Sequence, residues 1–455
     1  MGNGKTVGGI PGTDGGYQWD VESQGRIVQE VDYLSGTYIP FWEVESNNPF
    51  DPSGTSAVAS DDPYIEGLSS HGHVYIGRAP VTSVIEADNY VSKLIAYYQQ
   101  LNSATYSEAM NREILLNGDV TCSSNGCSGE LVTYLNNKLI NEHIPVTTIL
   151  DTLNVSGHNY CPTQETWKYC PNRQSIFESI LNQGAAIISM LSTTGGPESF
   201  GDWYWCSDNR GPLPHPEISF NLSNKNTGMP FLIAPSCTQG AVHLSNFECT
   251  TRKLMVYDNG GIIGAIAPTQ GSEQHANGYV LNRFNDLLFQ DNTPTYGEIF
   301  KILKNELAIN YPSLEYYYNS LTYFGDPSLV PAIYKHRSGS MTSSTTWSGN
   351  FVVDASITVS SGVNLTILPG SNLFFEHLAY FNVNGYLNAV GTSSKKISFS
   401  LLLNGWSSWG KIKFEHIAET TPPQSVLDNV NIYNSKGVSC INYDNVIIRN
   451  SLLNS

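Results

Sequence analysis

The chain has 455 residues, which is enough for two or more separate cores, and only 14% of them are charged. Acidic residues outnumber basic ones, 40 to 23, so the formal net charge is −17. This balance argues against nucleic acid as a partner, because binding to phosphates needs clustered lysine and arginine. No apolar run approaches the ~20 residues that cross a bilayer, so we expect no membrane span in this chain.

The N-terminal residues 1–29 are rich in glycine and lack the apolar stretch of a signal peptide. A Gly4-Lys5-Thr6 tripeptide lacks the leading glycine and the preceding strand of a phosphate-binding loop. We therefore interpret this segment as a flexible terminus. Either the protein is intracellular, or the export signal lies outside this chain.

Four of the eight cysteines occur in pairs with short spacings. Cys122 and Cys127 lie in TCSSNGCSG, and Cys161 and Cys170 bracket CPTQETWKYC. These spacings suit small disulfide loops and favour a secreted or cell-surface protein. Reduced thiols are one alternative, and a zinc site that includes His158 is another, although the CxxC pairs of structural zinc sites are missing.

Residues 30–335 are predicted to form an α/β domain with a largely parallel sheet, because short apolar runs alternate with amphipathic segments. The predicted strands are 38–44, 73–81, 113–120, 144–150, 184–191, 230–236 and 260–268, and the predicted helices are 84–101, 129–143 and 274–290.

Residues 336–350 are interpreted as a linker. Residues 351–455 have a different sequence pattern from the domain before them. Short triplets rich in β-branched and aromatic residues recur there, the first four at intervals of about eight residues, with Asn and Gly between them. Such periodicity predicts the coils of a solenoid, and this part resembles the right-handed parallel β-helix domains of bacterial surface proteins. A β-sandwich is the alternative. The last residues carry no polar cap, so we expect a truncated domain or assembly through its open end. The triplets begin at residues 357, 365, 373, 381, 397, 412, 430 and 446.

Cys237 follows the predicted strand in PFLIAPSCTQG (230–240). The carboxyl end of a parallel strand is a suitable place for a reactive cysteine, since the next loop or helix can supply N–H groups to a thiolate. A cysteine among small residues is also often a buried structural thiol. The residues around Cys237 leave both interpretations open.

A series of segments resembles the gingipain-type family of cysteine peptidases. The matching segments occur in order over about residues 30–335: SDDPYIEG with a following IGR, then PFLIAPSCTQG, FECTTRKLMVYDNGGIIGAIAPTQGS and YFGDPSLVP. The resemblance implies a caspase-like α/β fold, no required cofactor, and Cys237 at the position of the nucleophile. In this family the catalytic histidine lies in a Gly-His-Gly segment at the end of the preceding strand.

Thr193 stands where the resemblance places that histidine, because the segment here reads Ser192-Thr193-Thr194. Threonine cannot accept a proton near neutral pH, so peptidase activity should be impaired unless another base takes over. His243 lies six residues beyond Cys237, and His215 lies in a Pro-rich loop, so both are candidate substitutes. A lone histidine is more often a structural or solvated residue.

Two further groups of residues are weaker candidates for a site. Asp61 and Asp62 lie where family members carry acidic loops, so they are candidate ligands of a structural Ca²⁺, although a solvated turn explains them more simply. Trp203 and Trp205 are candidates for lining a ligand groove, and packing against the sheet is the alternative.

The leading hypothesis is a secreted or surface-attached bacterial protein whose gingipain-like domain is catalytically impaired and acts in binding or scaffolding. Its expected partner is an extracellular protein or a surface glycan. One alternative is an active extracellular cysteine endopeptidase with a relocated base. Another is a structural or adhesive protein that acts through its β-helix.

Overall fold

The structure, a computed structural model, describes residues 9–11, 17–19, 42–46, 56–60, 76–101, 108–117, 122–123, 126–127, 137–144, 148–154, 171–191, 199–200, 205–206, 220–242, 249–403, 407–415, 424–441 and 445–454. Contacts divide the chain into one unit of residues 1–100 and 107–329 and a second of residues 101–106 and 330–455. Among the helices in the described ranges, none has both the length and the apolar content of a membrane span.

The first unit is built on a mixed sheet with the described strand order β14-β13-β12-β9-β5-β8. Every neighbouring pair in it is parallel except β13 and β14, which are antiparallel. The expectation of a largely parallel sheet is therefore confirmed. Its strands are β5 (Arg112–Asn117), β8 (Ile149–Asn154), β9 (Ile187–Leu191), β12 (Phe231–Ile233), β13 (Gly264–Pro268) and β14 (Leu321–Phe324).

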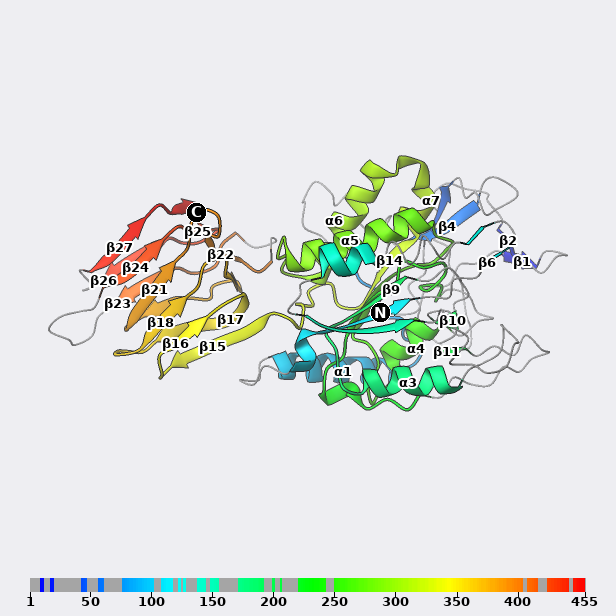
Figure 1. The fold of residues 1–455 in the computed structure, drawn as a ribbon, viewed down its shortest axis with the longest axis horizontal. Helices are drawn as coiled ribbons and strands as arrows, with labels where there is room; N and C mark the ends of the chain where they lie inside the picture. Colours follow the sequence, from blue (N-terminus) through cyan, green and yellow to red (C-terminus); the bar gives the residue numbers. More distant parts are fainter. Residues whose placement is uncertain are drawn as a thin grey trace. The chain divides into compact units, whose positions relative to one another are not determined.

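Helices cover both faces of this sheet (Figure 1). On one face, α1 (Val84–Leu101), α3 (Pro171–Leu181) and α4 (Thr250–Val256) contribute to a buried apolar cluster with the strands. On the other face lie α5 (Gln274–Phe289), α6 (Tyr296–Asn310) and α7 (Glu315–Ser320). Two of the predicted helices, 84–101 and 274–290, are thus confirmed.

The remaining described elements of this unit are β1 (Gly9–Pro11), β2 (Tyr17–Trp19), β3 (Trp42–Ser46), β4 (Ser56–Ser60), η3 (Glu108–Asn111), β6 (Cys122–Ser123), β7 (Gly126–Cys127), η4 (Leu139–His143), β10 (Ser199–Phe200), β11 (Trp205–Cys206), η5 (Asn224–Asn226) and η6 (Pro312–Leu314).

Three predicted strands differ from the structure. The strand predicted at 144–150 shares only Ile149 and Leu150 with β8. The strand predicted at 38–44 corresponds to β3, which pairs with β4 in an antiparallel hairpin rather than with the main sheet. In the segment 73–81, the described residues 76–81 form one isolated bridge, from Arg78 to Phe324, and no strand. Pro80 lacks the N–H group that a longer ladder would need.

A buried lysine ties α1 to α4. The Lys93 side chain is fully buried, and its Nζ donates hydrogen bonds to the carbonyl oxygens of Leu254 (2.8 Å) and Met255 (2.9 Å). Burial lowers the pKa of Lys93 well below its ordinary value. These carbonyls belong to the last turn of α4, where backbone acceptors lack partners within the helix.

The pair Gly260-Gly261 before β13 is required by close packing. A Cβ atom on Gly261 would lie 2.1 Å from the Leu254 carbonyl oxygen, and its φ of +89° is in the left-handed region. Gly261→Ala should therefore lower the free energy of unfolding by about 1–3 kcal/mol, measured by chemical denaturation. Gly339→Ala is the control, because Gly339 has a φ of +79° but nothing within 4 Å of its Cβ position. Equal losses in the two variants would contradict the packing argument.

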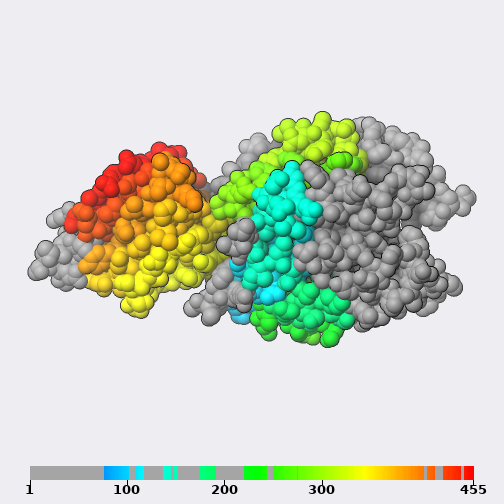
Figure 2. All heavy atoms as spheres, viewed as in Figure 1, coloured from blue at the N-terminus to red at the C-terminus, as the bar shows by residue number. Residues whose placement is uncertain are grey.

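The second unit consists of parallel strands that pair with strands of neighbouring coils. For example, β18 pairs with β21, and β21 pairs with β24, all in parallel register. The space-filling view shows colour passing in bands from yellow to red along this unit, as stacked coils require (Figure 2). The strands are β15 (Lys335–Met341), β16 (Thr345–Trp347), β17 (Asn350–Val359), β18 (Asn364–Ile367), β19 (Asn372–Phe375), β20 (Phe381–Val383), β21 (Tyr386–Val390), β22 (Ile397–Leu401), β23 (Ile412–Glu415), β24 (Ser425–Asp428), β25 (Val430–Tyr433), β26 (Val438–Ile441), β27 (Val446–Arg449) and β28 (Leu452–Asn454).

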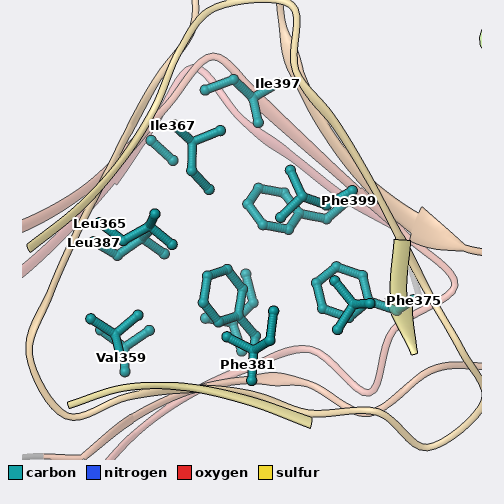
Figure 3. Close-up of a cluster of buried hydrophobic side chains, with 14 of the residues drawn as sticks. Val359, Leu365, Ile367, Phe375, Phe381, Leu387, Ile397 and Phe399 are labelled. Carbon is teal, nitrogen blue, oxygen red and sulfur yellow. The ribbon is translucent and has the colours of Figure 1, made fainter. Parts of the chain in front are cut away.

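The core of this unit lies inside the coils. Figure 3 shows Val359, Leu365, Phe381 and Phe399 among the side chains that point inward from the sides of a triangular backbone path. Alternate residues along β22 are buried and half-buried, because successive side chains of a strand point to opposite faces. The curled parallel sheets are compatible with the predicted β-helix.

The segment 336–350, interpreted from the sequence as a linker, carries β15 and β16 instead. Both strands pair in parallel with strands of the next coil, β15 with β17 and β16 with β18. Trp347, at the end of β16, is buried in the core of the coils. The Ser, Thr and Gly residues of this segment suggested a linker, but alternation of exposed and buried side chains lets polar residues occupy the outer face of a strand.

Candidate active site

Cys237 lies just beyond β12, near the middle of the sheet of the first unit. The strand before it is buried throughout, and the chain turns at Ser236-Cys237. The Cys237 side chain is half-buried and its thiol is free. The sequence therefore placed the cysteine correctly at the carboxyl end of a parallel strand, where loops of neighbouring strands meet.

Among the described residues, the Cys237 sulfur is contacted from the loop that follows the neighbouring strand. β12 and β13 run in parallel, so the loops that follow them lie at the same edge of the sheet. Ser272, in the loop after β13, places its backbone N 3.2 Å and its Oγ 3.3 Å from Cys237 Sγ. The thiol in turn lies 3.6 Å from the Ser272 carbonyl oxygen, to which it can donate.

The loop that carries Cys237 is held by backbone hydrogen bonds to the segment after β13. Thr238 N donates to the Gln270 carbonyl oxygen, and Gly240 N donates to that of Pro268, each at 2.9 Å. Thr238 has a φ of +55°, an uncommon left-handed conformation for a residue with a branched side chain. Such strain is typical of functional sites, where the surrounding structure enforces it.

Two tyrosines of α7 approach the same loop. Tyr317 Oη donates to the Pro235 carbonyl oxygen at 3.5 Å. Burial raises the pKa of Tyr316 to about 12, with smaller contributions from nearby Glu273 and Cys237. Burial likewise raises the pKa of Tyr317 well above its ordinary value. Both phenols therefore stay neutral at physiological pH and keep the proton of the hydroxyl group.

Helix α5 begins beside Ser272. Glu273 is its N-cap residue and accepts a hydrogen bond from Ala276 N at 3.0 Å. One turn into the helix, the buried Asn277 Nδ2 donates to Ser272 Oγ at 3.0 Å. Neither Ser272 nor Asn277 was predicted from the sequence. The signal that points to them is their position after β13, since neighbouring parallel strands end at the same edge.

Most other candidate residues lie outside the described part of the chain. For Cys122, Cys127 and Trp205 the structure places the backbone in β6, β7 and β11 but not the side chain. The register of β6 and β7 puts Cys122 opposite Cys127, and their disulfide stays a prediction. The candidates outside the described residues are Asp61, Asp62, Cys161, Cys170, Thr193, Trp203, His215 and His243.

The model of peptidase family C25 matches residues 15–332, which is most of the chain. The chain belongs to peptidase family C25, the gingipain family. The resemblance recognised in the sequence is thereby confirmed, and the mostly parallel sheet agrees with the caspase-like α/β fold that it implies.

Solved structures of gingipains are among those similar to this family C25 chain. The Arg-specific cysteine proteinase gingipain R has 18% identity and a TM-score of 0.44, with 60% of each chain covered. The complex of the Porphyromonas gingivalis RgpB pro- and mature domains has 19% identity and a TM-score of 0.45, with 60% of this chain and 61% of that chain covered. The chain thus spans about three fifths of these structures. No curated protein sequence matches it.

Proposed function

We propose that the first unit is a gingipain-type peptidase scaffold that has kept the nucleophile position, Cys237, but is impaired in catalysis and acts in binding. Thr193 occupies the histidine position by sequence. The observation that carries the proposal is the sequence Ser192-Thr193-Thr194 at the position of the family's Gly-His-Gly segment. Within the described residues, the groups in hydrogen-bond reach of Cys237 Sγ belong to Ser272.

The chemistry of a cysteine peptidase explains why loss of the catalytic histidine would impair cleavage. Cleavage of a peptide needs a sulfur nucleophile, a base that takes its proton and later protonates the leaving amine, and N–H donors for the oxyanion. Threonine supplies a hydroxyl that neither accepts nor donates a proton readily at neutral pH. The site around Cys237 would then bind a peptide segment of an extracellular protein without cleaving it.

A peptide-library assay on the full chain tests this function. We expect the wild-type protein to show no cleavage that depends on Cys237, since loss of the base in such sites typically costs at least about 10³-fold in rate. Thr193→His should raise cleavage by orders of magnitude, and a further Cys237→Ala change should abolish the gain.

The opposite outcome identifies the active-enzyme alternative. If wild-type protein cleaves the library and Cys237→Ala alone removes that cleavage, the scaffold is a working endopeptidase. His243→Ala and His215→Ala would then show which imidazole serves as the base. Neither variant should affect a protein that only binds.

We also propose that the protein is secreted or attached to the cell surface and that the second unit is a right-handed parallel β-helix. The low content of charged residues and the spacing of the paired cysteines support export. Cell fractionation with an antibody against the full chain tests this placement. Recovery of all the protein in the intracellular fraction would contradict it.

A further inference from the structure

The hydroxyl group of Ser272 has two partners, the side chains of Asn277 and Cys237. Asn277 Nδ2 donates to Ser272 Oγ at 3.0 Å, and Cys237 Sγ lies 3.3 Å from the same oxygen. An amide nitrogen can only donate, so it occupies an acceptor site of the hydroxyl. When the thiol donates its own proton to the Ser272 carbonyl oxygen, or has lost it, the hydroxyl hydrogen is free to point at the sulfur.

The backbone of Ser272 supplies a second donor to the same sulfur. Ser272 N lies 3.2 Å from Cys237 Sγ. Hydrogen bonds from an N–H and an O–H group stabilise negative charge on sulfur as the thiol proton leaves. Both donors come from one residue, and α5 holds that residue in place through Asn277.

We propose that Ser272 is a positioning residue, oriented by Asn277, that keeps the Cys237 sulfur reactive. This inference rests on the proposed function only in taking Cys237 as the functional position. It concerns attack by the sulfur on an electrophile, whereas the proposed function concerns peptide cleavage. The two can therefore fail independently.

The alternative is that Ser272 only packs the loop after β13. Ser272 is 7% exposed and Asn277 is 2% exposed, so truncation of either residue would loosen its surroundings. A looser loop exposes the half-buried Cys237 and makes it react faster. Loss of a hydrogen bond to the sulfur makes it react more slowly, so the direction of the change separates the two roles.

The rate at which iodoacetamide alkylates Cys237 at pH 7 shows whether the sulfur reacts faster or more slowly. It is measured by mass spectrometry on the full chain. In the reaction a C–S bond forms, iodide leaves and the thiol proton passes to the buffer. We expect Ser272→Ala to react about three- to tenfold more slowly at Cys237, which is the range that one hydrogen bond accounts for. Ser272→Thr keeps the hydroxyl and should restore most of the rate.

A double-mutant cycle tests whether Asn277 affects the Cys237 sulfur through Ser272. Asn277→Ala should slow alkylation less than Ser272→Ala does, and the double variant should react within about twofold of Ser272→Ala alone, because Asn277 acts through the Ser272 hydroxyl. Asn285→Ala is the matched control. It removes a buried asparagine two turns further along α5, whose Nδ2 bonds the Leu281 carbonyl oxygen, and it should leave the rate unchanged.

Three outcomes would overturn the proposal. Ser272→Ala could react as fast as wild-type protein or faster, Ser272→Thr could fail to recover the rate while thermal unfolding stays normal, or the two single effects could multiply in the double variant. A melting curve of each variant identifies those that do not fold. If Ser272→Ala does not fold, the alkylation rate of Asn277→Ala tests the proposal instead.

Discussion

Trp409→Ala should lower the free energy of unfolding of the second unit by about 3–5 kcal/mol, the range for truncation of a buried tryptophan. The Trp409 ring is fully buried and stacks on Phe375 with the centroids 4.1 Å apart. Its Nε1 donates to the Tyr433 carbonyl oxygen at 2.8 Å. The substitution therefore leaves a large cavity and removes a hydrogen bond between successive segments of the coil.

Two further variants separate these contributions in chemical denaturation experiments. Trp409→Phe keeps an aromatic ring but removes the N–H group, so it should cost less than the alanine change, about 1–2 kcal/mol. Leu368→Ala is the control for truncation of an apolar side chain, because Leu368 is 39% exposed. If Trp409→Ala costs no more than Leu368→Ala, the aromatic stack does not determine the stability of the coils.

The coils of the second unit were largely predictable because their pattern is local. Each predicted triplet lies within a strand, since apolar residues at every second position must face the interior. The apolar pattern did not predict β21, where Tyr386 and Asn388 interrupt it, or β24, which carries Ser425 and Asp428. Those strands are fixed by the parallel register with neighbouring coils, which sequence alone does not show.

In the first unit, too, elements with a clear pattern in their own sequence were predicted, and elements that depend on contacts with distant residues were not. Helix α1 was predicted with its bounds because its amphipathic pattern is long and regular. Helix α6 and strand β14 were missed. Tyr296, at the start of α6, is buried against Phe231 of β12 with ring centroids 3.9 Å apart, a contact between residues far apart in the sequence.

Of the residues around the Cys237 sulfur, only Cys237 itself, at the end of one strand, could be predicted from the sequence. Cys237 could be placed because PFLIAPS is an apolar strand with a cysteine after it. Ser272 could not be found in this way, because it lies 35 positions further on and meets Cys237 only through the parallel pairing of β12 and β13. The residues that touch a reactive group are set by sheet order, and sheet order is a non-local property.

Glu113→Gln should make the first unit more stable at pH 8 while leaving its stability near pH 4.5 almost unchanged. Glu113 lies in β5 and is fully buried, with Oε1 accepting a hydrogen bond from Ser189 Oγ at 2.6 Å. Burial raises the pKa of Glu113 from 4.5 to about 7. The folded protein therefore holds this proton more tightly than the unfolded chain does.

The sign of the effect follows from proton linkage. Between pH 4.5 and 7 the folded state binds more protons than the unfolded state, so stability falls as the pH rises. The contribution of the protonated carboxyl is complete below pH 4.5 and lost above pH 7, a total of about 3 kcal/mol at 1.36 kcal/mol per pKa unit. Glutamine copies the neutral carboxyl, keeps an acceptor for Ser189 and stays uncharged at every pH.

Denaturation curves measured from pH 4.5 to 8 test this prediction. The free energy of unfolding of Glu113→Gln, less that of wild-type protein, should increase by about 3 kcal/mol across this range. Glu142→Gln is the matched control, because Glu142 is exposed and its substitution should change stability little at any pH. A constant difference between Glu113→Gln and wild-type protein would mean that Glu113 is already ionised in the folded state at pH 4.5 or reaches water there.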